Sequence, residues 1–166
     1  MLKPLPLSAS FKALGFKENP FSVSADPRFL YLSMQHQVVL EAIQRVIADH
    51  QGLAVVEGQV GVGKSTLARR LVDLYMANAP DYNVLYLHTA AYKTSFDALS
   101  DIATKFGVRP RRSEIALRDE LEQWLVKQRT EGRTPIIIVD DAQLIAPESL
   151  EAFQSIYNFD VREKLA

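Results

Sequence analysis

The sequence predicts an α/β fold built on a parallel β-sheet, and two observations point to it. First, short apolar segments of strand length alternate with longer segments in which apolar residues recur at helical spacing. Second, the segments 53–57, 83–88 and 136–139 are apolar almost throughout, as expected of strands buried on both faces. Such alternation favours βαβ units with right-handed crossovers, so we expect three parallel strands flanked by helices.

Length and composition limit the function classes. The 166 residues, 48% hydrophobic and 23% charged, suffice for the core of one globular domain. A net charge of −1 provides no overall basic field for nucleic acid or anionic lipid, so any DNA contact would be local. The sequence contains no cysteine, which excludes disulfides and fits a reducing compartment. Its apolar runs are far shorter than the roughly 20 residues of a membrane span, and we expect a cytoplasmic protein.

The N-terminal region lacks regular periodicity. We expect a loose leader over residues 1–10 and, over residues 11–32, an irregular arm in which prolines and aromatic residues are mixed. The aromatic rings could close one edge of the core or form a wall against a nucleotide base, and the sequence leaves both interpretations open.

Ser33 is the expected N-cap of a helix over residues 34–49, in which Val38, Val39, Ala42, Ile43, Val46 and Ile47 recur at helical spacing. The strand at 53–57 follows. After a glycine-rich loop, a second helix should run to about Asn78 with Leu67, Leu71, Leu74 and Tyr75 facing the core.

The second half of the chain repeats this order. After the strand at 83–88, Ser95 should cap a helix that runs through Phe106, with Gly107 as its stop signal. A helix over about 113–129 then leads to the strand at 136–139. Pro147 should begin the last helix, because proline suits the first helical position.

The loop over residues 58–66 reads GQVGVGKST and fits G-x-x-x-x-G-K-[ST], the phosphate-binding P-loop or Walker A motif. Its glycines allow several backbone N–H groups to converge on a polyphosphate. The helix that begins near the lysine adds the positive end of its dipole. The candidate nucleotide-binding residues are Gly58, Gly61, Val62, Gly63, Lys64, Ser65 and Thr66.

The expected chemistry is shared between this loop and a strand end. Lys64 would neutralise the β- and γ-phosphates, and the Ser65 hydroxyl would ligate Mg²⁺, which prefers oxygen ligands. The strand and acidic pair at 136–141 resemble a Walker B motif, in which Asp140 would hold the Mg²⁺ from the sheet edge where ligands bind. Asp141 is the candidate to orient or deprotonate the attacking water; alternatively, it is a turn or N-cap residue.

Four segments together resemble the AAA+ ATPases of the ExeA type: 19–21 (NPF), 26–33 (DPRFLYLS), the 58–66 loop and 136–151. That group includes the general secretion pathway protein A and is related to the TniB and TnsC transposition ATPases. The resemblance covers nearly all of the chain after residue 10. It implies a P-loop NTPase fold of the AAA+ (ASCE) class, ATP and Mg²⁺ as cofactors, and an arm near the adenine.

Two departures from the family pattern affect these expectations. The family usually has a glutamate where this chain has Asp141, whose shorter side chain would slow hydrolysis while binding persists. The family's strand order 5-1-4-3-2 places a fourth strand between 53–57 and 136–139. That strand, a fifth, an arginine finger and a helical lid would follow Ala166. We therefore expect residues 11–166 to be the N-terminal part of an AAA+ domain, truncated within its sheet.

The leading functional hypothesis is an ATP-binding module that hydrolyses ATP with Mg²⁺ in its complete, homo-oligomeric form, because an arginine finger is supplied by a neighbour. Hydrolysis by the truncated chain would be weak, and the protein partner would belong to a secretion or transposition system.

The alternative is an ATP-dependent DNA-binding adaptor for transposition, suggested by Lys93, Arg109, Arg111 and Arg112. Three nearby acids, Glu114, Asp119 and Glu120, favour a solvated basic turn instead. A small-molecule kinase is disfavoured, since nothing after Lys64 resembles a substrate lid.

Overall fold

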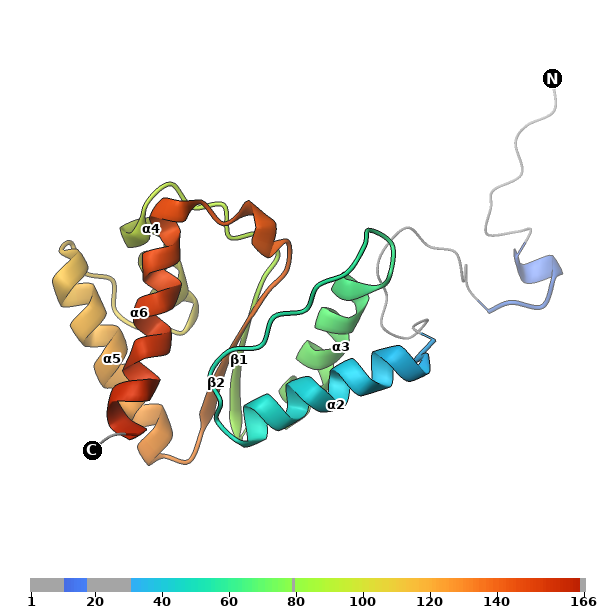
Figure 1. The fold of residues 1–166 in the computed structure, drawn as a ribbon, viewed down its shortest axis with the longest axis horizontal. Coiled ribbons are helices and arrows are strands. Elements are labelled where there is room, and N and C mark those ends of the chain that lie inside the picture. The colour runs from blue at the N-terminus through green and yellow to red at the C-terminus, as the bar shows by residue number, and fades with distance from the viewer. Residues whose placement is uncertain (1–10, 18–30, 79, 165–166) are drawn as a thin grey trace, which may run out of the picture.

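The computed structural model describes residues 11–17, 31–78 and 80–164. The expected leader at 1–10 and the arm residues 18–30 lie outside these ranges. At the centre is a parallel pair of strands, β1 (Tyr82–Leu87) and β2 (Thr134–Val139). Figure 1 shows helices α2 and α3 on one side of this pair and α4, α5 and α6 on the other. The α/β class with a parallel sheet and flanking helices is therefore confirmed.

Where the sequence analysis gave a helix bound, the structure places it within about two residues of that position. They are α2 (Met34–Ala48), α3 (Lys64–Met76), α4 (Ser95–Lys105), α5 (Glu114–Thr130) and α6 (Pro147–Lys164), with a short 3₁₀ helix η2 (Ala142–Leu144) before the last. In the described part of the chain, no helix combines the length and apolarity that crossing a bilayer requires.

The helix caps agree with the expectation at α2 and differ at α4. Ser33 caps α2, its hydroxyl accepting a hydrogen bond from the His36 backbone N–H. At α4 the cap is Thr94 and not Ser95, so that expectation was wrong. Thr94 has the extended backbone that an N-cap requires, and its hydroxyl accepts from the Asp97 N–H at 3.1 Å. Ser95 is already helical and buried.

Both faces of the strand pair are covered by helices, which explains why most of the strand residues are apolar; Asn83 of β1 instead donates through Nδ2 to Gln128 Oε1 of α5 at 2.6 Å. The register aligns Val84 with Ile136 and Tyr86 with Ile138. Alternate side chains point to opposite faces. Ile136 and Ile138 pack with residues of α2 and α3, whereas Leu85, Leu87, Ile137 and Val139 pack with residues of α4 and α6.

The expected strand at 53–57 was wrong: the described residues contain two strands, and this segment belongs to neither. Leu53 and Val55 are 68% and 72% exposed. The physical reason is that a strand exists only where its backbone groups pair with a neighbour. β1 and β2 pair with each other, and neither of them pairs with 53–57. Apolar composition alone therefore does not make this segment a strand.

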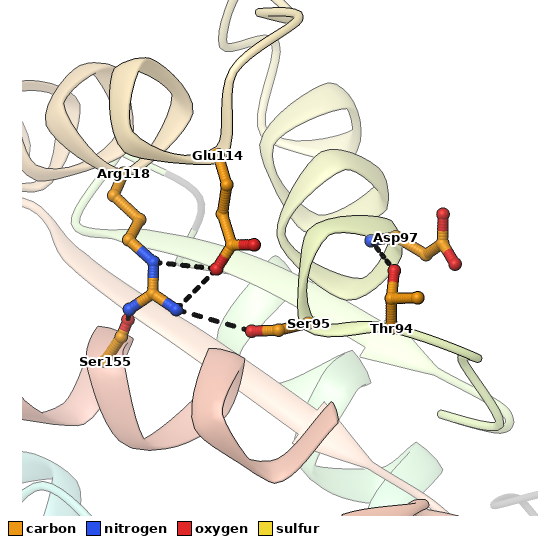
Figure 2. Close-up of polar contacts among 6 residues, drawn as sticks. All are labelled: Thr94, Ser95, Asp97, Glu114, Arg118 and Ser155. Carbon is orange, nitrogen blue, oxygen red and sulfur yellow. Dashed lines mark hydrogen bonds and ion pairs between the residues drawn. The ribbon is translucent and has the colours of Figure 1, made fainter. Parts of the chain in front are cut away.

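A single arginine joins the three helices on one side of the sheet. Arg118 of α5 donates to the Glu114 carboxylate, to the Ser155 hydroxyl of α6 at 2.6 Å and to the Ser95 hydroxyl of α4 at 3.4 Å (Figure 2). Residues of the same three helices form most of a core cluster: Ala98, Leu99, Ala103, Val108, Leu117, Leu121 and Ala152. Arg118 therefore links α4, α5 and α6 through polar bonds, in addition to their apolar packing.

Candidate functional site

The loop before α3 has a backbone that depends on glycine. Gly61 and Gly63 have φ of +86° and +93°, in the left-handed region that side chains disfavour. A Cβ on Gly58 would lie 3.1 Å from Val62 Cγ2, closer than ordinary contact. The three glycines of the motif thus permit a turn that other residues would strain or crowd.

The N-terminus of α3 suits an anion. Its N-cap is Gly63, which has no side chain to accept a hydrogen bond from the first-turn N–H groups. The first helical residues are Lys64, Ser65 and Thr66, so their N–H groups and the positive end of the helix dipole lie beside the loop. This is the arrangement that commonly binds phosphate at helix N-termini.

Lys64 lies over the loop that precedes it. Its Nζ donates to the carbonyl oxygens of Gly58 at 2.7 Å and Gln59 at 2.8 Å. Both acceptors are neutral and on the exposed side of the loop. Phosphate oxygens carry full charge and form stronger, charge-assisted bonds, so the ammonium can exchange these carbonyls for a phosphate.

The two candidate metal ligands meet in the structure. Ser65 Oγ donates to Asp140 Oδ1 at 3.1 Å. Asp140 directly follows β2, and its N–H donates to the Leu87 carbonyl, which extends the pairing of the strands by one bond. A hydroxyl from the start of α3 and a carboxylate from a strand end therefore lie at one point. Mg²⁺ in nucleotide sites takes few protein ligands and completes its shell with water and phosphate, which this pair fits.

Tyr86 is a site residue that the sequence analysis missed. Its hydroxyl donates to the second carboxylate oxygen of Asp140, Oδ2, at 2.9 Å. Burial raises the pKa of Tyr86, the hydrogen bond to Asp140 raises it further, and Arg69 offsets part of the rise. The phenol therefore keeps its hydrogen and donates it. Strand parity was the available signal, because Tyr86 pairs with Ile138 and so shares the face of Asp140, two residues on.

Asp141 occupies a turn. Its φ of +49° is left-handed, and it is the residue before η2. Its N–H donates to Asp140 Oδ1 at 3.1 Å, and its own Oδ1 accepts from Gln143 Nε2 at 2.9 Å. The exposed carboxylate thus faces its own turn in this structure, and its place beside the reacting centre stays a prediction.

The basic residues at 109–112 do not share one environment. Arg111 donates through Nε and Nη2 to the Glu120 carboxylate, at 2.9 Å for the first bond. Arg109 and Arg112 are exposed. Glu120 therefore offsets part of the positive charge of this turn, as the solvated-turn interpretation expects.

Comparisons with known proteins agree with this geometry. A family model described as an AAA domain matches residues 45–166, which include the 58–66 loop and Asp140. General secretion pathway protein A of Aeromonas hydrophila is 28% identical over 153 residues, 90% of this chain and 27% of that protein. This chain thus spans about a quarter of that relative's length. No solved structure matches this chain significantly. The chain therefore belongs to the AAA domain family and is similar to general secretion pathway protein A.

Proposed function

We propose that this chain binds ATP together with Mg²⁺ and forms the nucleotide-binding part of an AAA+ ATPase that hydrolyses ATP as an oligomer. The observation that carries the proposal is the 3.1 Å hydrogen bond between Ser65 and Asp140. This bond joins the Ser65 hydroxyl, which belongs to the 58–66 loop, to the Asp140 carboxylate at the end of a strand. P-loop NTPases hold Mg²⁺ with this combination of groups.

The proposed roles follow from the geometry of each group. The amides of the glycine loop and of the first turn of α3, through Thr66, bind the phosphates. Lys64 exchanges its loop carbonyls for the β- and γ-phosphate oxygens. Ser65 and Asp140 hold Mg²⁺, which neutralises phosphate charge when bound. Tyr86 fixes the rotation of the Asp140 carboxylate through Oδ2.

For hydrolysis, we propose Asp141 as the residue that orients the attacking water. A general base must come within about 3 Å of its water, directly or through one further water. Asp141 would have to exchange its bond from Gln143 for that water. The short aspartate side chain makes this step slow. We therefore expect the chain to bind ATP but to hydrolyse it slowly.

The proposed partners are further copies of the same module and a protein of a secretion or transposition system in the cytoplasm. The relative's printed name supports a secretion pathway. The bond from Arg111 to Glu120 weakens the case for DNA as the partner, since that arginine is already engaged.

Nucleotide titration of purified protein tests the proposal. ATP with Mg²⁺ should bind the wild-type chain, and Lys64→Ala should weaken binding about ten- to hundredfold, because charge-assisted bonds are each worth about 1.5–3 kcal/mol. Lys127→Ala is the matched control, since Lys127 is an exposed lysine of α5. Equal ATP affinity in Lys64→Ala and the control would refute the proposal.

A further inference from the structure

A histidine from α2 contacts the phosphate-type loop. His36 Nε2 lies 2.9 Å from the carbonyl oxygen of Val62, although 26 positions separate the two residues. A carbonyl oxygen can only accept, so Nε2 carries the hydrogen and donates it. Val62 directly precedes Gly63, the N-cap of α3. The bond therefore ties α2 to the last peptide before the helix.

The histidine ring is held on its other side as well. Ser33 Oγ lies 2.9 Å from His36 Nδ1, and the same oxygen accepts from the His36 backbone N–H at 3.3 Å. In the neutral imidazole, Nδ1 accepts the Ser33 hydroxyl hydrogen while Nε2 donates to Val62. The N-cap of α2 thus sets the direction in which the ring donates.

The geometry of a peptide group converts this contact into an orientation of the loop. The Val62–Gly63 peptide is planar and trans, so the Val62 C=O and the Gly63 N–H point in opposite directions. A carbonyl held toward α2 directs the Gly63 N–H away from α2. Gly63 itself has a φ of +93°, one of many conformations open to glycine. Without a restraint, the peptide would have to be ordered each time a phosphate binds.

We propose that His36 is a positioning residue for polyphosphate binding: it fixes the Val62–Gly63 peptide so that the loop amide is oriented before the nucleotide arrives. This inference rests on the proposed function, since the ligand is the phosphate chain of ATP. Ordering a residue on binding costs conformational entropy, and a loop that is ordered in advance avoids that loss. The contribution corresponds to about a tenfold tighter affinity for ATP.

Two amide variants separate the donor from the rest of the side chain. Glutamine can place its Nε2 where the imidazole Nε2 lies, whereas asparagine reaches only as far as Nδ1. We expect His36→Gln to keep the wild-type ATP affinity and His36→Asn to lose about tenfold. Urea unfolding should show that both variants are folded under the binding conditions, and Gln35→Asn on the exposed side of α2 is the control. Weaker binding in both variants would overturn the donor role.

A second measurement tests the conformation of the Gly63 amide in the absence of nucleotide. In ¹H–¹⁵N spectra, His36→Asn should shift the Gly63 amide and speed its hydrogen exchange, and His36→Gln should leave both near wild type. An unchanged Gly63 amide in His36→Asn would overturn the inference. Failure of the wild-type chain to bind ATP would overturn the proposed function and the positioning role with it. Wild-type binding with equal affinity in His36→Asn would overturn the positioning role alone.

Discussion

Ser65 at the start of α3 and Asp140 at the end of β2 are joined by a 3.1 Å hydrogen bond, although 75 positions separate them. The bond connects the loop that suits phosphate with the carboxyl edge of the sheet. Because Tyr86 holds the other carboxylate oxygen, Asp140 is fixed from α3 and from β1 at once. A cation at this point would therefore meet a carboxylate of defined orientation.

Replacing Asp140 tests the cation site. Asp140→Asn removes the charge and keeps the shape, so ATP binding should lose its dependence on Mg²⁺ while weak, metal-free binding persists. Loss of a ligand or its orienting group typically weakens metal affinity about 10–100-fold. Isothermal titration of Mg²⁺ in the presence of ATP measures this. Asp119→Asn, on the exposed side of α5, is the control, and a Mg²⁺ dependence like the wild type's in Asp140→Asn would contradict the assignment.

Replacing Tyr86 tests the orientation of that carboxylate. Tyr86→Phe removes only the hydroxyl that donates to Asp140 Oδ2. The free energy of unfolding should fall by about 1 kcal/mol, the net value of one hydrogen bond. The apparent Mg²⁺ affinity should fall as well, since the carboxylate can rotate. Tyr157→Phe, a half-exposed tyrosine of α6, serves for comparison; equal Mg²⁺ affinity in Tyr86→Phe would limit Tyr86 to a structural role.

Two residues of α5 provide a matched test of the core. Leu117 is fully buried, whereas Ile115, two positions earlier, is 74% exposed. Leu117→Ala should lower the free energy of unfolding by about 2–5 kcal/mol, because it leaves a cavity in the core cluster between α4, α5 and α6. Ile115→Ala should change it by less than about 0.5 kcal/mol. Urea denaturation of both variants measures these free energies. Similar losses in the two variants would contradict the assignment of Leu117 to the core.

Asp101 predicts a pH dependence of stability. Burial alone would raise its pKa, but hydrogen bonds from Lys105 at 2.6 Å and Tyr92 at 2.5 Å lower it below the usual value of 3.8. A lowered folded-state pKa adds stability above the unfolded-state pKa, and that stability is lost as the pH falls through the folded value. Asp101 therefore stabilises the fold at pH 7 and ceases to do so in strong acid.

The measurement compares urea midpoints of the wild type and Asp101→Asn at pH 7 and pH 3. At pH 7 the variant should be less stable by about 1 kcal/mol. The difference should shrink as the pH falls below about 4. Asp97→Asn, on the same helix, controls for the general loss of negative charge. A difference that stays constant between the two pH values would rule out Asp101 as the source.

The helices were predictable because their signals are local. Ser33 and Gly107 mark helix ends by properties of their own side chains or backbones, and both act where the sequence places them. The shift of the α4 cap from Ser95 to Thr94 shows the limit of such signals. Both residues carry a suitable hydroxyl, so only the backbone angles of the folded chain distinguish them.

The strand prediction failed where the outcome depends on a partner. Segment 53–57 has the same apolar character as β1 and β2 but pairs with neither of them. Tyr86 and His36 were missed for a similar reason, because each acts on a residue far along the chain. No periodicity records which distant carbonyl or carboxylate a side chain will reach.

By itself, the sequence determined the order of the helices, the glycine loop and the family, since these depend on neighbouring residues and their spacing. Only the tertiary structure decided that Ser65 and Asp140 touch, that Tyr86 orients the carboxylate and that His36 holds Val62. The physical reason is that a hydrogen bond forms within about 3 Å, and which groups come that close depends on how helices pack on the strand pair.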